Sequence, residues 1–304
     1  MRQTGKIWMD GRLVPFRDAR VHVLTHALHY STSVFEGLRC YRARGGPAVF
    51  RMREHVARLF RSAALYSMRM RYTEPRIGRA ILDTVRANRL QECYIRPLAY
   101  CGFGEMGLTP TKNRVDVSIS CWKWGGGEYS AGRSSGAKCR VSSWRKIGPG
   151  SQPMQAKAAS NYGNAALARM EALRDGYDEA IMLNEMGMVA EGSAENVFAV
   201  RDGAIYTPPL SAGGLDGITR DSVMEIALAD GYDVAEMQMS RDDLYSADEV
   251  FMTGTAAEVR SVAEIDGIKI GDGKVGPATK GLQKSFADVA RGRDERFSEW
   301  LTPV

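Results

Sequence analysis

The sequence predicts a two-domain protein that mixes α-helices and β-strands, in an α+β or α/β arrangement. Its 304 residues exceed one average domain of roughly 150 residues. Amphipathic helical patterns alternate with short runs that are typical of strands. A stretch rich in glycine and serine at 122–135 interrupts both patterns and is typical of a linker. We therefore expect a small N-terminal domain at 1–121, that linker, and a large C-terminal domain at 136–304.

The first domain should begin with a hairpin. Apolar residues at 7–9 and 12–14 flank Asp10-Gly11, a pair that favours a tight hairpin turn. Apolar residues spaced by three and four predict amphipathic helices at 53–68 and 74–90. Two helices beside several strands can cover one face of a sheet.

A strand is expected at 92–100, and its Tyr94 and Arg96 should point to the same face because strand side chains alternate. The loop Gly102–Gly107 behind it matches the G-x-G-x-x-G pattern of dinucleotide-binding enzymes. That fingerprint requires a helix at its end, whereas Pro110 blocks one and another strand pattern follows. We therefore reject the hypothesis of a nucleotide-dependent dehydrogenase.

The second domain should open with a helix at 164–175 that ends at Gly176. We expect Leu167, Met170 and Leu173 to face its core. Further elements follow from apolar periodicity and turn signals: strands within 180–206, a helix at 219–229, a strand at 249–253 and a helix at 277–291.

Composition excludes several classes of function. No run of about 18 apolar residues is present, so no membrane span is expected. The five cysteines form no Cys-x-x-Cys pair, which favours reduced thiols in the cytoplasm. The histidines of residues 22–29 lack acidic or thiol neighbours at ligand spacing, so no metal is expected. The first half is basic and the second acidic, but the arginines of the first half are scattered through amphipathic elements, so nucleic acid is not an expected partner.

The segment 154–163 directs attention to chemistry, because Lys157 lies there among small residues. A lysine is usually a solvated surface group, but downstream stretches supply what a lysine-bound aldehyde cofactor needs. Glu191 ends a strand and could hold a proton on a pyridine ring. Gly217 opens a helix whose first amides suit a phosphate, and Thr255 lies in a tight turn. We therefore predict that Lys157 carries pyridoxal phosphate as a Schiff base and that the protein is an aminotransferase.

Seven stretches resemble the branched-chain-amino-acid aminotransferases, which belong to the D-amino-acid-aminotransferase-like (fold type IV) group of pyridoxal phosphate enzymes. They occur in family order over nearly the whole chain, at 29–39, 50–59, 94–97, 156–162, 191–198, 215–221 and 251–258. The resemblance implies two domains with the active site at their interface.

The resemblance also implies residue roles. Lys157 would be the catalytic residue, which binds the cofactor and moves a proton to and from the substrate α-carbon. The residues implied to bind the cofactor are Arg58, Lys157, Tyr162, Glu191, Ile218, Thr219 and Thr255. Those implied to line the substrate cleft are Tyr30, Phe35, Tyr94, Arg96, Tyr129 and Ala256. The linker reads Lys123-Trp-Gly-Gly-Gly-Glu-Tyr129, where the family usually has a shorter Pro-Trp-Gly-Ala-Tyr, so the role of Tyr129 stays open.

The reaction implied is transamination of L-leucine, L-isoleucine or L-valine with 2-oxoglutarate, which gives branched-chain 2-oxo acids and L-glutamate. A D-amino-acid or (R)-amine aminotransferase of the same fold stays an alternative, with aminodeoxychorismate lyase as a more distant one. In such enzymes the loop at 102–108 reaches the active site of the neighbouring subunit. The resemblance therefore implies a homodimer or higher homo-oligomer that acts on small molecules.

Overall fold

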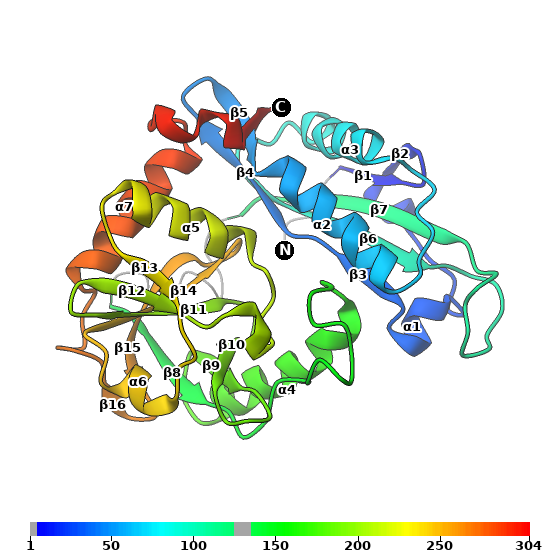
Figure 1. The fold of residues 1–304 in the computed structure, drawn as a ribbon. Coiled ribbons are helices and arrows are strands. Elements are labelled where there is room, and N and C mark those ends of the chain that lie inside the picture. The colour runs from blue at the N-terminus through cyan, green and yellow to red at the C-terminus, as the bar shows by residue number, and fades with distance from the viewer. Residues whose placement is uncertain (1–4, 125–134) are drawn as a thin grey trace. The chain divides into compact units, whose positions relative to one another are not determined.

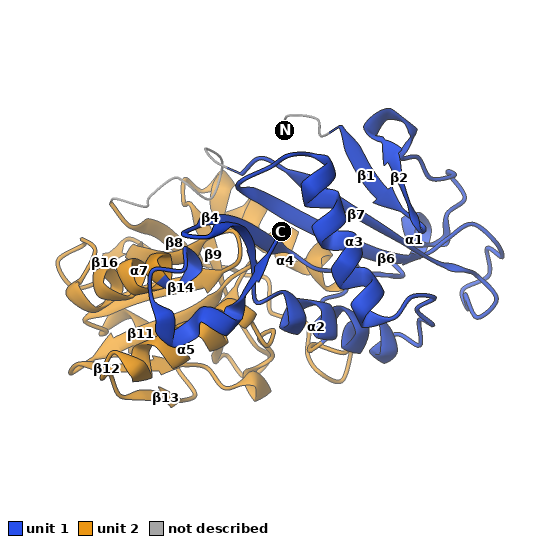
Figure 2. Cartoon of the chain, turned by 90° about the horizontal axis from the view of Figure 1, so that it is seen from above, with its two compact units in different colours: residues 1–124, 156–160, 289–304 blue, residues 125–155, 161–288 orange. Residues whose placement is uncertain are grey.

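The computed structural model describes residues 5–124 and 135–304 (Figure 1). The chain divides into two compact units, coloured separately in Figure 2. Unit 1 comprises residues 1–124, 156–160 and 289–304, and unit 2 comprises residues 125–155 and 161–288.

This division differs from the expected one in two places. The segment that carries Lys157 belongs to unit 1, since Ala158 forms a β-bridge with Val34. The C-terminal residues also belong to unit 1, because strand β17 (Leu301–Pro303) pairs with β5 (Gly46–Phe50). Pairing between strands that are remote in sequence leaves no local trace in the composition. The predicted domain boundary therefore depended only on the glycine- and serine-rich stretch at 122–135.

Unit 1 is built on an eight-stranded antiparallel sheet in the order β17-β5-β4-β6-β7-β1-β2, with β3 paired to β6. Its other strands are β1 (Lys6–Met9), β2 (Arg12–Pro15), β3 (Ser33–Phe35), β4 (Leu38–Ala43), β6 (Cys93–Cys101) and β7 (Val115–Trp122). Its helices are α1 (His26–Tyr30), α2 (Met52–Leu65) and α3 (Glu74–Ala87), with short 3-10 turns at Phe16–Asp18 and Glu295–Trp300.

Helices α2 and α3 cover one face of this sheet (Figure 1). Their buried apolar residues, among them Leu59, Ile77 and Ile81, join those of the strands in one core. The predicted hairpin is confirmed: β1 pairs with β2, and Asp10 and Gly11 both have positive φ. After the glycine-rich loop the chain forms β7, as expected, and not a nucleotide-binding helix.

Unit 2 is built on a nine-stranded mixed sheet in the order β10-β9-β8-β15-β14-β11-β12-β13, with β16 paired to β15. The strands are β8 (Ala137–Val141), β9 (Glu179–Leu183), β10 (Val189–Gly192), β11 (Asn196–Arg201), β12 (Ala204–Thr207), β13 (Val234–Glu236), β14 (Glu249–Gly254), β15 (Glu258–Ile265) and β16 (Ile268–Lys269). The helices are α4 (Ala159–Arg174, whose first two residues belong to unit 1), α5 (Ile218–Ala229), α6 (Arg241–Tyr245) and α7 (Pro277–Ala290), with a 3-10 turn at Leu210–Ala212.

Helix α4 packs with its alanines and not with its large apolar residues. Ala168 and Ala172 are fully buried against strand β9. Leu167, Met170 and Leu173 are exposed by 40%, 57% and 46%, so the expectation that they face the core was wrong. The alanines and the large apolar residues both recur at helical spacing. The alanine face packs on the sheet because small side chains allow the helix axis to approach the strands closely.

Within the described residues, no helix combines the length and the apolar character that crossing a bilayer would require.

Candidate active site

The Lys157 segment is attached to unit 1 as a short extension of the β3 edge. The Phe35 amide donates to the Lys157 carbonyl at 3.0 Å, and the Lys157 amide donates to Ser62 Oγ at 3.0 Å. Ala156 and Ala158 on either side are buried in the unit 1 core. Because side chains alternate along an extended segment, the buried alanines direct the lysine side chain away from that core.

The Lys157 amine lies among charged and aromatic groups of unit 1. Its Nζ atom lies 5.1 Å from the centre of the Phe35 ring. Burial, together with the positive charge of Arg58, lowers the pKa of Lys157 from 10.5 to about 8, and Glu36 opposes this effect only in part. Roughly a tenth of the amine is therefore uncharged at neutral pH, and the uncharged amine is the nucleophilic form.

The lowered pKa predicts how the reactivity of Lys157 depends on pH. Trace acetylation of the apoprotein, read by mass spectrometry, should show Lys157 titrating with a midpoint near 8. The same peptide in denaturant should titrate near 10.5, the ordinary value for lysine, because unfolding restores water around the amine. Equal midpoints in both conditions would show that the folded protein does not perturb this amine. Since the unfolded chain binds this proton more tightly, the free-energy cost of burying Lys157 should fall as the pH rises from 8 towards 10.5.

Arg58 is buried on helix α2. Its Nε donates to Glu36 Oε1 at 2.6 Å and its Nη2 to Glu36 Oε2 at 2.9 Å. His55 Nδ1 lies 2.7 Å from the same Oε2. An ionised carboxylate only accepts, so His55 donates this bond from Nδ1.

The charges of this cluster are fixed by its contacts. Burial alone raises the pKa of Glu36, but Arg58 and His55 outweigh it and hold the pKa well below its usual range. Burial lowers the pKa of His55, against the pull of Glu36. At neutral pH the cluster is therefore one carboxylate and one guanidinium with a neutral imidazole, and the guanidinium is held in a fixed orientation by two parallel bonds.

Sequence reasoning selected Arg58 but did not select Glu36 or His55. A signal was present in helix α2: His55, Arg58 and Ser62 recur at helical spacing and form a polar row beside the apolar stripe. A polar row that adjoins an apolar stripe is a candidate for buried contacts. Nothing local linked Glu36 to that row.

Phe35, Tyr94 and Arg96 lie together, as the strand alternation predicted for the last two. The Arg96 guanidinium lies 4.7 Å from the Phe35 ring centre and donates from Nη2 to the Tyr94 hydroxyl at 3.3 Å. Within the described residues, its buried Nε has no hydrogen-bond partner. A cation with an unsatisfied buried donor beside two aromatic rings suits a ligand that carries a carboxylate and an apolar group.

Gly37 makes room for this arrangement. A Cβ atom at that position would overlap the hydroxyl of Tyr94, so a larger residue would displace the ring that accepts from Arg96. The amino-acid pattern around this glycine offered no reason to choose it.

The other predicted tyrosines have different surroundings. Tyr30 is exposed at the end of α1, and its hydroxyl donates to the Met106 carbonyl at 3.3 Å. Tyr162 is half-buried on the first turns of α4. Tyr129 lies outside the described residues, so its predicted role stays a prediction.

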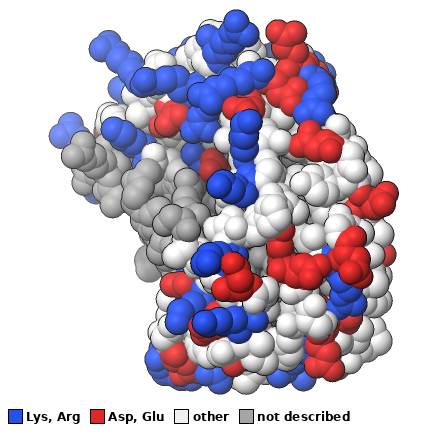
Figure 3. Space-filling model, turned by 90° about the vertical axis from the view of Figure 1, so that its left-hand side faces the viewer, with Lys and Arg blue, Asp and Glu red and all other residues white. Residues whose placement is uncertain are grey.

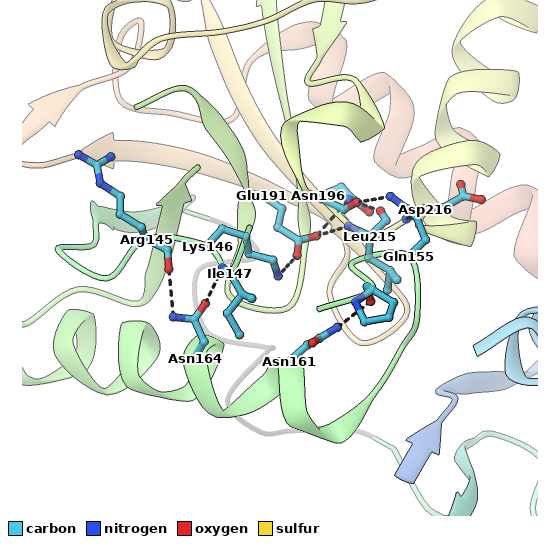
Figure 4. Close-up of polar contacts among 12 residues, drawn as sticks. Arg145, Lys146, Ile147, Gln155, Asn161, Asn164, Glu191, Asn196, Leu215 and Asp216 are labelled. Carbon is cyan, nitrogen blue, oxygen red and sulfur yellow. Dashed lines mark hydrogen bonds and ion pairs between the residues drawn. The ribbon is translucent and has the colours of Figure 1, made fainter. Parts of the chain in front are cut away.

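Unit 2 contributes a second cluster, centred on Glu191 (Figure 4). Glu191 is buried on strand β10, which carries a β-bulge between Val189 and Glu191. Its Oε2 accepts the Leu215 amide at 2.9 Å and lies 3.5 Å from the Asn196 side-chain nitrogen. Asn196 also donates to the Leu215 carbonyl at 2.9 Å, and this bond fixes the loop that leads into helix α5.

Ile218 and Thr219 are the first two residues of α5, and both are buried. Among the residues that the structure describes, no side chain caps this helix start, so its first amide groups remain available to an anion. The preceding Gly217 lies so close to Asn196 that a Cβ would overlap the side-chain oxygen. A larger residue at 217 would therefore displace the Asn196 side chain.

Thr255 and Ala256 belong to the turn between β14 and β15, and both are half-buried. Strand β14 places this turn beside the Asn196 strand, because Thr253 pairs with Asn196 in the ladder. Glu191, the start of α5 and the Thr255 turn thus converge on Asn196, which sequence reasoning did not select.

Unit 1 contains a half-buried amine, and unit 2 contains a buried carboxylate and a helix start without a side-chain cap. These are the kinds of group that a cofactor with an aldehyde, a ring nitrogen and a phosphate requires. The chain belongs to the class IV amino-transferase family, whose model matches residues 33–265.

Among its relatives, the branched-chain-amino-acid aminotransferase of Salmonella typhimurium is 44% identical over 98% of this chain and 97% of the relative. The crystal structure of the T.th. branched-chain amino acid aminotransferase with pyridoxamine 5'-phosphate is 45% identical, with a TM-score of 0.97 over 100% of this chain and 99% of that one. A complex of the same enzyme with 4-methylvaleric acid superposes with a TM-score of 0.95, at the same identity and coverage.

Proposed function

We propose that this protein is a pyridoxal phosphate-dependent branched-chain-amino-acid aminotransferase. It transfers the amino group of L-leucine, L-isoleucine or L-valine to 2-oxoglutarate, and the products are a branched-chain 2-oxo acid and L-glutamate. The observation that carries this proposal is the Lys157 amine, whose pKa burial lowers to about 8. Full-length similarity to enzymes of that name supports the choice of substrate class.

The residues present fit the cofactor. Arg58 and the amides of Ile218 and Thr219, with Thr255, supply positive charge and N–H donors for a phosphate. Glu191 supplies a carboxylate for the protonated ring nitrogen, and Tyr162 a hydroxyl for the ring oxygen. When bound, pyridoxal phosphate supplies the electron sink that allows the substrate α-C–H bond to ionise.

Lys157 performs the proton transfer in this proposal. Its amine is uncharged often enough at neutral pH to accept a proton, and its segment is held by backbone hydrogen bonds to Phe35 and Ser62. A base on a fixed segment reaches the same atom in each turnover, which is the geometric condition for general acid–base catalysis.

Substrate recognition follows from the two-sided character of the group formed by Phe35, Tyr94 and Arg96. The aromatic rings suit an apolar side chain. The Arg96 guanidinium suits the distal carboxylate of glutamate or 2-oxoglutarate, because the carboxylate oxygens accept hydrogen bonds from its N–H groups. One pocket can therefore accept both substrates of the reaction.

A panel of amino donors tests the proposal. With 2-oxoglutarate as acceptor, the purified protein should use L-leucine, L-isoleucine and L-valine, and activity confined to D-amino acids or (R)-amines would contradict the proposal.

The Arg96→Ala variant tests the carboxylate-binding role of Arg96. With L-glutamate as donor and a branched-chain 2-oxo acid as acceptor, the variant should lose about 100-fold in kcat/KM for glutamate, because a buried charge-assisted pair is lost. Its loss with leucine and a monocarboxylic 2-oxo acid should be less than about fivefold, since the apolar contacts remain. Equal losses with both donors would remove Arg96 as the carboxylate-binding residue.

We also propose a homodimer or higher homo-oligomer. Large apolar side chains are exposed around α1 and on the loop that follows β6, namely Val23, Leu24, Leu28, Phe103 and Leu108. Monomeric proteins rarely expose apolar residues in such a group, so we expect a second copy of the chain to cover these side chains.

A cytoplasmic location is proposed as well, since all five cysteines are free and buried.

Nucleic acid is a less suitable partner than small molecules. On the face drawn in Figure 3, aspartate and glutamate side chains lie among and beside the lysine and arginine side chains. A nucleic-acid site requires a continuous basic surface, and this face does not offer one.

A further inference from the structure

Lys146 is a buried lysine of unit 2, and it contacts Glu191 directly. Its Nζ atom forms an ion pair with Glu191 Oε1, and both side chains are only 8% exposed. The pair comes from separate elements, since Lys146 lies in the loop after β8 and Glu191 on β10 (Figure 4).

The backbone around Lys146 is held in place on both sides. Its amide donates to the Leu183 carbonyl at 2.8 Å. The Asn164 side chain of α4 accepts from the Ile147 amide at 3.3 Å and donates to the Arg145 carbonyl at 3.0 Å (Figure 4). The ammonium group is therefore presented to Glu191 by a loop that is tied both to the sheet and to a helix.

The Glu191 carboxylate has one acceptor position that is not occupied by Lys146 or by the other described donors. An ionised carboxylate accepts at about four positions, two on each oxygen. Oε2 receives the Leu215 amide and the Asn196 amide group, whereas Oε1, over the described parts of the chain, receives Lys146. The remaining acceptor position is on Oε1, next to the ammonium group.

We propose that Lys146 is a positioning residue for the cofactor ring. It supplies the counter-charge of Glu191 and holds the carboxylate in one orientation, so that the last acceptor position on Oε1 receives the ring N–H. A buried carboxylate without a cation is costly to keep ionised, and a neutral carboxyl group would present its own proton to the ring nitrogen. This inference rests on the proposed function, because it assigns Glu191 to the pyridine nitrogen.

The test uses two ligands that bind without a covalent bond: pyridoxamine 5'-phosphate and its 1-deaza analogue, in which CH replaces the ring nitrogen. Dissociation constants are measured by equilibrium dialysis against the full-length apoprotein. Lys146→Met should weaken binding of pyridoxamine phosphate about tenfold and leave binding of the deaza analogue unchanged. Lys146→Arg keeps the cation and should bind both ligands as the wild type does.

Two further variants make the result specific. In a Glu191→Gln background, adding Lys146→Met should change the affinity for pyridoxamine phosphate less than about twofold, because the two residues act as one unit. Arg145→Met removes the exposed neighbouring cation and should leave both affinities unchanged. An equal loss for both ligands in Lys146→Met would show general damage to the loop, and an unchanged affinity for pyridoxamine phosphate would show no role; either result overturns the inference. Wild-type protein that binds neither ligand would overturn the proposed function itself and the inference with it.

Discussion

The Lys157→Ala protein is expected to fold normally, to lose the yellow colour of the cofactor-loaded wild type and to lose transaminase activity. Removal of the group assigned both to cofactor attachment and to proton transfer should lower kcat by at least about four orders of magnitude. Folding should survive because the segment is held by its backbone, through the Lys157 amide and carbonyl. The burial that lowers the pKa of Lys157 also disfavours its charged form, so the variant should be at least as stable as the wild type at neutral pH.

The measurements are the absorption spectrum after reconstitution with pyridoxal phosphate, the initial rate with L-leucine and 2-oxoglutarate, and the thermal midpoint of both proteins. Lys138→Ala is a matched control, since that lysine on β8 is exposed and pairs with Glu264 at the surface, at 3.3 Å. The control should match the wild type in all three measurements. A Lys157→Ala protein that kept its colour and its rate would show that another amine performs the chemistry.

The elements of this fold were largely accessible from the sequence, because each depends on local patterns. Two helices of unit 1 were predicted from apolar spacing, and the structure confirms them as α2 and α3. The turn at Asp10-Gly11 was predicted from its residue types, and the alternation of β6 placed Tyr94 beside Arg96. Such features follow from periodicity and turn chemistry within a few residues.

The arrangement of the active-site groups was not accessible in the same way. Glu36 meets Arg58 only because β3 and β4 bring the 33–43 region beneath helix α2. Lys146 meets Glu191 only because the loop after β8 is tied to β9 and α4. These are contacts between segments that are remote in sequence, and no local spacing encodes them.

Helix α4 shows a related limit. Its apolar residues predicted a buried face through Leu167, Met170 and Leu173, whereas the buried face carries Ala168 and Ala172. Periodicity gives the direction of a possible face but not which of two faces the sheet selects. The choice depends on how closely the helix can approach β9, which is a property of the packed unit.

Replacing Glu36 with glutamine is expected to destabilise the protein by about 3 kcal/mol, because it leaves the buried Arg58 guanidinium without its counter-charge. Arg58, Glu36 and His55 are all almost completely buried, so water cannot replace the lost partner. The glutamine NH2 group would also face at least one of the donor groups of Arg58 and His55 from which the carboxylate now accepts. The measurement is the free energy of unfolding from denaturant titration at pH 7.

Glu54→Gln is the matched control, because Glu54 lies on helix α2, as Arg58 does, and also pairs with an arginine, Arg51, at 3.2 Å. The Glu54 side chain is 40% exposed, whereas that of Arg51 is 8% exposed. Because water reaches the Glu54 end of this pair, its loss should cost less than the loss of the fully buried Glu36 charge. A loss in Glu36→Gln no larger than that in Glu54→Gln would show that the buried cluster does not stabilise the fold.

The pH dependence of the Glu36 effect has a definite sign. Arg58 and His55 hold the pKa of Glu36 well below its ordinary value of 4.5, so the unfolded chain takes up this proton first as the pH falls. The stability that the carboxylate contributes is therefore complete above about pH 5 and decreases as the pH falls below 4.5. The difference between wild type and Glu36→Gln should shrink over that range, whereas a loss that came only from altered packing would stay constant. Because Arg58 is also the proposed phosphate ligand, the variant should bind pyridoxamine phosphate more weakly at pH 7, which would connect the buried cluster to cofactor binding as well as to stability.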